Sequence, residues 1–196
     1  MTAEEHSSDE YPLRERLIDA LELCFNQRGM QKTTLGHVAR EAGVSRMTVY
    51  RHFEDKQALF AAAALRNIRR QWKDITASME ATERLDDWLM QAMLLFHSMS
   101  SQDEAVALYS RIDGHEMGLE VALSKPGLEA ITSHFAELFD KAARENILAP
   151  GITTEDIAEW IHRTNYSLVA IPSERLQQKD KLRRWLSMQI NGIVAR

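Results

Sequence analysis

One short stretch, residues 45–52, gathers hydroxyl, guanidinium, phenol and imidazole groups within eight positions. Guanidinium groups pair with phosphates and donate to base edges, and hydroxyl groups donate to phosphate oxygens. A methionine in the same stretch offers a soft apolar tip for a thymine methyl group. These side chains are Ser45, Arg46, Met47, Thr48, Tyr50, Arg51 and His52. Their chemistry predicts contact with double-stranded DNA.

The charge around this stretch is opposite to that of the whole chain. The 196 residues carry 24 Lys and Arg against 29 Asp and Glu, a net charge of −5. Residues 28–73 instead hold ten Lys and Arg against only Glu41, Glu54 and Asp55. Counterion release makes such a basic block a candidate for binding phosphates. On charge alone, a solvated helical surface is an equal alternative.

Apolar spacing predicts that helices position these groups. From Tyr11, apolar residues recur at steps of three, four and one as far as Phe25, and Gly29 ends the first helix. Thr33 or Thr34 begins a second helix, Ser45 a third, and Asp55 a fourth that runs to about Ser78. Further helices are predicted near 83–100, 103–111, 115–124, 127–146, 154–171 and 175–195. We find no alternating β-branched run, so no sheet is expected.

The second and third helices form a helix-turn-helix pattern. Gly43 suits the positive φ that the turn Ala42–Ser45 needs, and Ala39 is small where two helices approach. Val49 and Phe53 are spaced to hold the third helix against a core. In this motif the second of the two helices lies in the major groove.

The stretch from Thr33 to Leu59 resembles the tetracycline-repressor (TetR) family signature. The matching elements are the paired threonines, VA-x-x-AGVS, T-[apolar]-Y-x-x-F, and an acidic residue followed by Lys-x-x-Leu. Met47 departs from the small residue usual at its position. The strong resemblance covers about residues 11–60, and the rest is similar only in length, helicity and arrangement.

The resemblance implies an all-α homodimer with an N-terminal three-helix DNA-binding domain and a C-terminal helical domain for ligand binding and dimerisation. We expect a disordered acidic tail over 1–10, the helix-turn-helix domain over 11–57, and the C-terminal domain over 58–196. Thr34 and Lys56 would hold phosphates, while Tyr50 and His52 would reach phosphates or base edges. Tyr50 as a core aromatic and His52 as a merely exposed residue are the alternatives. The complete expected DNA-binding set is Thr33, Thr34, Ser45, Arg46, Met47, Thr48, Tyr50, Arg51, His52 and Lys56.

The C-terminal part is rich in methionine and aromatic residues that line adaptable apolar cavities, although most such residues pack in cores. The expected ligand-binding residues are Trp88, Met93, Phe96, His97, Tyr109, Arg111, His134 and Tyr166. A metal site from His97, His115, Glu116 and His134 lacks a close histidine pair, so no metal is expected. The chain has no glycine-rich phosphate loop, nucleophile elbow or His-Glu-x-x-His motif, so neither an enzyme nor a cofactor is expected.

The last two predicted helices carry apolar residues at helical spacing, which favours a four-helix bundle across a two-fold axis. The expected dimer residues are Ile157, Trp160, Ile161, Leu168, Leu182, Trp185, Leu186 and Ile190. Packing within a single subunit is the alternative for these helices. Cys24 lies on an apolar stripe and is expected to pack in a core.

No apolar run approaches the roughly 20 residues of a membrane span, and the polar start is unlike a targeting peptide. The sequence therefore predicts a cytoplasmic regulator, in this family most often a repressor, that leaves a palindromic operator when a small, mainly hydrophobic effector binds. A helical scaffold or partner-binding dimer that does not bind DNA is the alternative.

Overall fold

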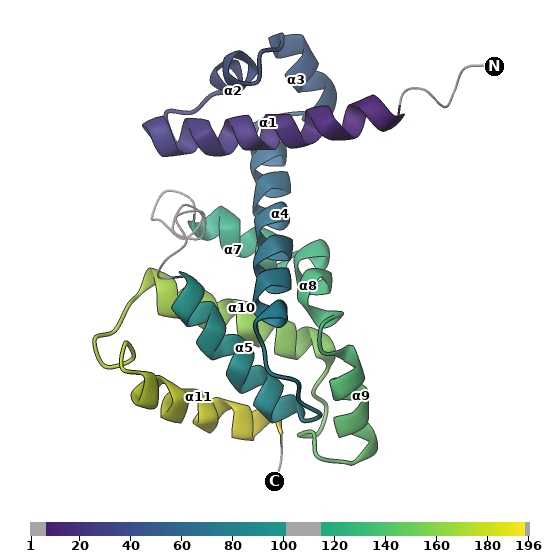
Figure 1. Ribbon diagram of the computed structural model, residues 1–196, viewed down its shortest axis with the longest axis vertical. Helices are drawn as coiled ribbons and strands as arrows, with labels where there is room; N and C mark the ends of the chain where they lie inside the picture. The colour runs from purple at the N-terminus through teal and green to yellow at the C-terminus, as the bar shows by residue number, and fades with distance from the viewer. Residues whose placement is uncertain (1–6, 101–114, 195–196) are drawn as a thin grey trace, which may run out of the picture. The chain divides into compact units, whose positions relative to one another are not determined.

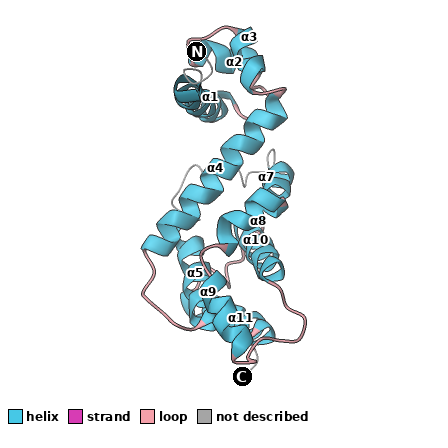
Figure 2. Ribbon diagram, turned by 90° about the vertical axis from the view of Figure 1, so that its right-hand side faces the viewer, coloured by secondary structure: helices cyan, strands magenta, loops and turns pink. Residues whose placement is uncertain are grey.

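The computed structural model describes residues 7–100 and 115–194, which are helical apart from turns and loops (Figures 1 and 2). The chain divides into two compact units, Met1–Arg66 and Asn67–Arg196. The division falls inside one continuous helix, α4 (Lys56–Ala77). The sequence suggested a boundary at residues 57 and 58, where this helix begins. The first half of α4 instead belongs with the N-terminal helices, because its side chains bind α1.

The first unit consists of α1 (Ser7–Arg28), α2 (Leu35–Glu41), α3 (Arg46–His52) and the beginning of α4. The first helix starts at Ser7 instead of Tyr11, so the expected tail over 1–10 is already helical in its last four residues. Residues 1–6 lie outside the described residues. The other three helices start within two residues of the predicted positions.

The core of the first unit is built on the apolar face of α1. Leu17, Leu21 and Phe25 are almost fully buried, and the ring of Phe25 lies 5.9 Å from that of Phe60 in α4. Cys24 is 1% exposed, which confirms its assignment to a core, and burial raises the pKa of its thiol.

A cluster of charges also joins α1 to α4. The guanidinium group of Arg66 contacts carboxylate oxygens of Glu15 at 2.8 Å, Asp19 at 2.7 Å and Glu22 at 2.9 Å. The Arg66 side chain is 28% exposed, so water screens these ion pairs only in part. Burial by itself would lower the pKa of Arg66, but the bonds to the three carboxylates outweigh it and raise the pKa above its usual value.

In the part of the second unit that the structure describes, the rest of α4 is followed by six further helices. These are α5 (Leu85–Ser100), α7 (His115–Leu123), α8 (Lys125–Thr132), α9 (Ala136–Arg144), α10 (Thr154–Ala170) and α11 (Lys179–Ile193). The segment expected near 103–111 lies outside the described residues. Helix α10 packs against α5, α7 and α8, and α11 packs against α5. An isolated antiparallel bridge between Leu148 and Val194 ties the loop before α10 to the end of α11.

Two of the predicted helices in this unit differ from the structure. The single helix expected over 127–146 is two helices, because the chain turns at Ser133 and His134 and the second helix begins after Phe135. The last helix starts at Lys179 instead of residue 175, after a turn in which the Leu176 amide donates to the Ser173 carbonyl. Helix α10 starts at Thr154 as expected, and Thr153 caps it through a reciprocal pair of hydrogen bonds with Asp156.

The core of the second unit is centred on aromatic rings. Trp72 in α4 stacks on Trp88 at 6.4 Å and on Phe96 at 6.1 Å between ring centroids. Trp88 in turn lies 5.2 Å from Phe135. Buried aliphatic residues of α10 and α11 complete the same cluster. The aromatic rings therefore fix α4 and α5 against each other within this unit.

Candidate nucleic-acid interface and ligand groove

The turn between α2 and α3 is formed by local backbone bonds. Gly43 has φ +68°, which L residues with a side chain rarely adopt. Its amide donates to the Arg40 carbonyl at 3.2 Å, and the Val44 amide donates to the Ala39 carbonyl at 2.9 Å. These bonds satisfy carbonyls at the end of α2 and redirect the chain into α3.

The two neighbouring threonines expected at the DNA have different roles. Thr34 is exposed and caps α2: its hydroxyl accepts from the His37 amide, and His37 Nδ1 accepts from the Thr34 amide. Thr33 is 1% exposed, and its hydroxyl donates to the backbone carbonyls of Cys24 and Gly29. The expectation that Thr33 contacts DNA is therefore wrong, because its side chain is enclosed between α1 and α2.

Ser45 caps α3 in the same way. Its hydroxyl oxygen accepts from the Thr48 amide at 3.1 Å and lies 2.9 Å from the Thr48 hydroxyl. Both hydroxyl groups therefore help to start the helix, while Ser45 stays exposed and Thr48 is half-buried. Ser45, the more exposed of the two residues, remains able to reach a phosphate.

Helix α3 separates buried and exposed side chains cleanly. Val49 is fully buried and Phe53 is 3% exposed, so this face holds the helix against the first unit. On the other side Met47 is 77% exposed and Tyr50 is 53% exposed. Arg51 follows one turn after Met47 and is also exposed. Tyr50 is therefore not the core aromatic of the alternative interpretation, and α3 presents a continuous face to solvent.

In the structure, the side chains of Arg46 and Lys56 contact other residues of the first unit. A Cβ atom added to Gly36 would lie only 2.5 Å from Arg46 Nη2, so the guanidinium group lies against the start of α2. Lys56 Nζ donates to the Met30 carbonyl at 3.2 Å. An ammonium group has three donors, so Lys56 retains further capacity for a phosphate. His52, the remaining member of the set, is half-buried.

Two arginines of α1, which the sequence interpretation missed, support the helix-turn-helix. Arg14 Nη1 donates to the carbonyl of His52, the last residue of α3, at 3.4 Å. Arg16 Nη2 donates to the carbonyl of Ala42, the C-cap of α2, at 2.9 Å. A cation at a helix C-terminus is favourable because the carbonyl groups there carry partial negative charge. Arg14 and Arg16 are the only Lys or Arg residues among the first 27. This isolated pair of positive charges was the signal available in the sequence.

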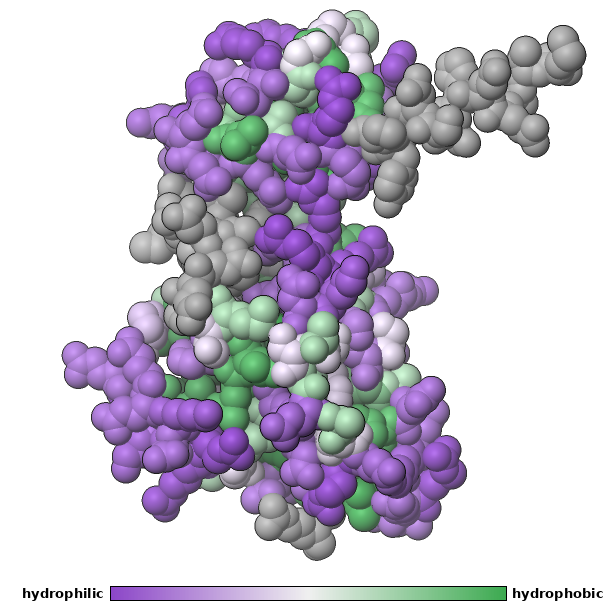
Figure 3. Space-filling view, in the orientation of Figure 1, coloured by the Kyte–Doolittle hydropathy of each residue, from purple (hydrophilic) through white to green (hydrophobic). Residues whose placement is uncertain are grey.

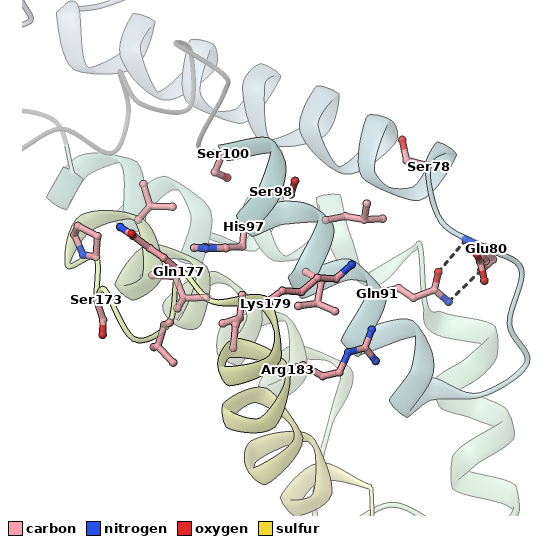
Figure 4. Close-up of a pocket in the computed structure, with 17 residues that line it drawn as sticks. Ser78, Glu80, Gln91, His97, Ser98, Ser100, Ser173, Gln177, Lys179 and Arg183 are labelled. Atoms are coloured by element: carbon pink, nitrogen blue, oxygen red, sulfur yellow. Dashed lines mark hydrogen bonds between the residues drawn. The ribbon is translucent and has the colours of Figure 1, made fainter.

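The second unit contains an elongated groove of about 880 Å³ between α5, the α10–α11 connection and α11 (Figure 4). Its lining is mixed, and its apolar part includes Leu94, Leu95, Val169 and Leu176. In Figure 3 an apolar area is visible on the surface of the second unit where Figure 1 draws α5 and this connection. Polar and charged side chains, among them His97, Lys179 and Arg183, stand between the apolar ones (Figure 4), and burial lowers the pKa of His97.

The residues expected to bind a ligand are not gathered around this groove. Trp88, Met93 and Phe96 are packed in the core, with at most 9% exposure, because the stack with Trp72 fills the space between them. His134 is exposed at the turn between α8 and α9. Of the expected residues that the structure describes, His97 lines the groove. Tyr166 is half-buried on α10, while Tyr109 and Arg111 lie outside the described residues.

Six of the eight residues expected at a dimer interface are buried in the core of their own chain. Ile157, Ile161, Leu168, Leu182, Leu186 and Ile190 are each at most 5% exposed. They are therefore unavailable to a partner subunit, and for these six the alternative of packing within one subunit is correct. Trp160 and Trp185 are half-buried, and Trp160 Nε1 donates to Gln189 Oε1 at 2.9 Å.

Within the described residues, no group of three His, Cys, Asp or Glu side chains is placed to hold a metal ion. None of the described helices is long and apolar enough to cross a membrane.

The helix-turn-helix geometry, with its exposed second helix, defines a DNA-binding transcriptional regulator, and comparison with known proteins agrees. Residues 17–63 match the family model described as bacterial regulatory proteins, tetR family. The chain is 27% identical over 160 residues to the uncharacterized HTH-type transcriptional regulator Rv1255c of Mycobacterium tuberculosis, covering 81% of this chain and 75% of that protein. It is 23% identical to HTH-type transcriptional regulator UidR of Escherichia coli over 93% of each protein.

Among solved structures, Salmonella enterica GusR superposes with a TM-score of 0.66 at 18% identity, covering 97% of this chain and 99% of that one. This likeness confirms the all-helical fold with an N-terminal helix-turn-helix. Residues 17–63 therefore carry the DNA-binding region of the tetR family of bacterial regulatory proteins, and the chain as a whole shares the fold of solved regulators.

Proposed function

We propose that this regulator is a repressor that binds a palindromic operator as a homodimer and leaves it when a small, mainly hydrophobic effector binds the second unit. The observation that carries the DNA half of this proposal is the solvent-facing side of α3, where Met47, Tyr50 and Arg51 are exposed while Val49 and Phe53 hold the helix in place. A rigidly held helix with such a face suits the major groove.

The side chains divide into two groups by their chemistry. Arg46 and Met47 lie at the N-terminal end of α3, which enters the groove first, so we assign them to base edges. Thr34, Tyr50 and Lys56 lie at helix starts or on the flank of α3, so we assign them to phosphates. The base-reading role of Arg46 requires its flexible side chain to leave Gly36 on binding.

The effector half of the proposal is supported by the groove and its connection to α4. Ser78 and Glu80, just beyond the end of α4, line the groove. Ser100 also lines it and lies within 3.4 Å of Gln71 Nε2 in α4, a bond between two buried side chains. An occupant of the groove therefore touches residues that directly follow α4 and a residue, Ser100, that is bonded to it. It acts only by its difference in affinity for the two states, about 5 kcal/mol for a near-complete switch.

The DNA half is tested by titrating labelled promoter fragments, including the chain's own, with the full protein at several salt concentrations. We expect half-sites one DNA turn or a multiple apart, and affinity that falls steeply with salt because phosphate contacts release counterions. The matched variant Tyr50→Ala should bind more weakly. Absence of salt-sensitive binding to any fragment would instead support the helical scaffold that does not bind DNA.

A further inference from the structure

Helix α10 places a polar patch inside the core of the second unit. His162 is 7% exposed, Thr164 is 7% exposed and Asn165 is 2% exposed. The ring of His162 meets the edge of Trp72 at 6.5 Å in a T-shaped contact, so the patch adjoins the aromatic stack of α4 and α5. A buried helix face normally carries apolar side chains, so these polar residues need a reason to be there.

Asn165 and one ring nitrogen of His162 keep unused hydrogen-bonding capacity, while a backbone hydrogen bond joins His162 to Gly127. Neither the Nδ2 nor the Oδ1 atom of Asn165 has a hydrogen-bond partner among the described residues, and the same is true of His162 Nε2. All three atoms are inaccessible to solvent. Each unsatisfied buried group lowers the stability of the fold, because it has lost its bonds to water without gaining others. An amide lacking partners for both its donor and its acceptor is suited to a group that enters from outside.

We propose that His162 and Asn165 are the polar anchor for the effector, and that they select a neutral group that both donates and accepts hydrogen bonds, an amide or a hydroxyl, carried on an aromatic or similarly apolar body. This inference rests on the proposed effector response and names the chemistry of the molecule.

The residues around His162 and Asn165 favour an uncharged ligand. The buried polar side chains of the described core are threonine, asparagine, glutamine, serine and histidine, with no buried Asp, Glu, Lys or Arg. Burial lowers the pKa of His162 to about 4, so its imidazole is neutral near pH 7. A carboxylate or an ammonium group would therefore lose its hydration without meeting an opposite charge.

The apolar body of the ligand follows from the neighbouring rings. Trp72, which meets His162 edge-on, is stacked on Trp88 and Phe96 inside the closed core, so a ligand that reaches His162 has to open this packing. A flat apolar body can replace the ring contacts that are lost. Because Trp72 belongs to α4, a ligand held by His162 touches that helix directly.

The first test measures the thermal stability of the full chain without ligand or DNA. Asn165→Leu and the smaller Asn165→Val should each raise the melting temperature by roughly 3–8 °C, because an apolar side chain removes unsatisfied groups. Gln71→Met is the matched control: this buried amide in the same unit has a partner, Ser100, so its loss should lower the melting temperature. A fall for both Asn165 variants would show that the amide supports the fold and would overturn the inference.

The second test uses four probes that share one ring and differ in the attached group. Benzamide, neutral with donor and acceptor, should raise the melting temperature of the wild-type protein, while benzoate and benzylamine at pH 7 should not. Toluene should stabilise Asn165→Leu at least as much as wild type, whereas benzamide should lose its effect on that variant. Equal shifts by benzamide on both proteins, or no shift at all, would overturn the inference.

Neither test uses DNA, so the two proposals fail separately. A protein that binds no operator but shows these shifts retains the ligand site without the proposed function. A protein that binds its operator but shows none of them retains the function without this anchor.

Discussion

The guanidinium carbon of Arg14 lies 4.3 Å from the centroid of the Phe53 ring. Phe53 caps the end of α3, and Arg14 also bonds the carbonyl of the residue before it. One side chain of α1 therefore holds the C-terminal end of α3 through both a cation–π contact and a hydrogen bond. The position of the DNA-facing helix depends on a residue that does not itself need to touch DNA.

Replacing Arg14 with methionine should weaken both folding and DNA binding. We expect Arg14→Met to lower the free energy of unfolding by about 1 kcal/mol, since the cation–π contact and the hydrogen bond are both lost. Operator affinity should fall several-fold and equally for all operators. Denaturant titration and anisotropy measure the two effects. Arg28→Met is the control, because this exposed arginine of α1 bonds only its neighbour Gln27 among the contacts shown by the structure; an equal loss in that variant would contradict a specific role for Arg14.

Substitutions on the exposed face of α3 should separate affinity from sequence choice. Tyr50→Ala should weaken binding to all operators about equally, because phosphate contacts carry no base information. Arg46→Ala should relax the preference at one base position by roughly 1–3 kcal/mol. Selection from a randomised operator library measures both changes. An unchanged consensus for Arg46→Ala would assign its guanidinium to α2 alone.

The left-handed glycine of the turn should resist substitution. Gly43→Ala should cost roughly 1–2 kcal/mol of stability, since φ +68° is unfavourable for alanine even though no atom lies within 4 Å of the added methyl group. Gly192→Ala is the opposite control: it lies within α11 with open space around it and should add about 0.5–1 kcal/mol through helix propensity. Thermal denaturation compares the two. Equal effects of the two substitutions would exclude backbone strain as the cause.

Stability should fall in mild acid partly through His162. The folded protein keeps this imidazole neutral down to pH about 4, whereas the unfolded chain takes up the proton near the ordinary pKa of 6.5. The stabilising contribution is thus complete above pH 6.5 and is lost as the pH falls towards 4, on the order of 3 kcal/mol. His162→Leu should flatten the stability profile over this range, measured by denaturant titration at each pH.

The comparison for this prediction is His97, which is half-buried and has its pKa lowered less strongly by the same cause. His97→Gln should change the profile in the same direction but by less. If His162→Leu leaves the slope between pH 6.5 and 4 as steep as in wild type, other groups account for the acid sensitivity.

The first unit could be predicted from the sequence because its signals are local. The cap at Thr34, the glycine turn and the spacing of Val49 and Phe53 each depend on residues within a few positions of one another. What escaped prediction there are contacts across long separations, such as Arg14 with His52 and Arg66 with the carboxylates of α1. No local pattern states which acidic residue an arginine will meet.

The second unit was harder to predict because apolar periodicity reports burial but not what causes it. Leu186 and Ile190 follow the spacing of an interface helix, yet α5 and α10 of the same chain contribute to the core that covers them. Phe96 is likewise of a type that lines cavities but is packed on Trp72. His162 and Asn165 were passed over because a single histidine and asparagine on a helix carry no motif. Their significance depends on the unsatisfied Asn165 amide and His162 Nε2 atom, which only the three-dimensional structure reveals.

No loop separates Arg66 from Asn67, because both residues lie inside α4. Inserting or deleting a single residue there turns the side chains that follow within this helix by about 100° about its axis, whereas a change of seven residues nearly restores their direction. Trp72 follows the junction by only five residues, so a single insertion would turn its ring away from Trp88 and Phe96. The packing of the second unit therefore limits which changes of length the middle of α4 tolerates.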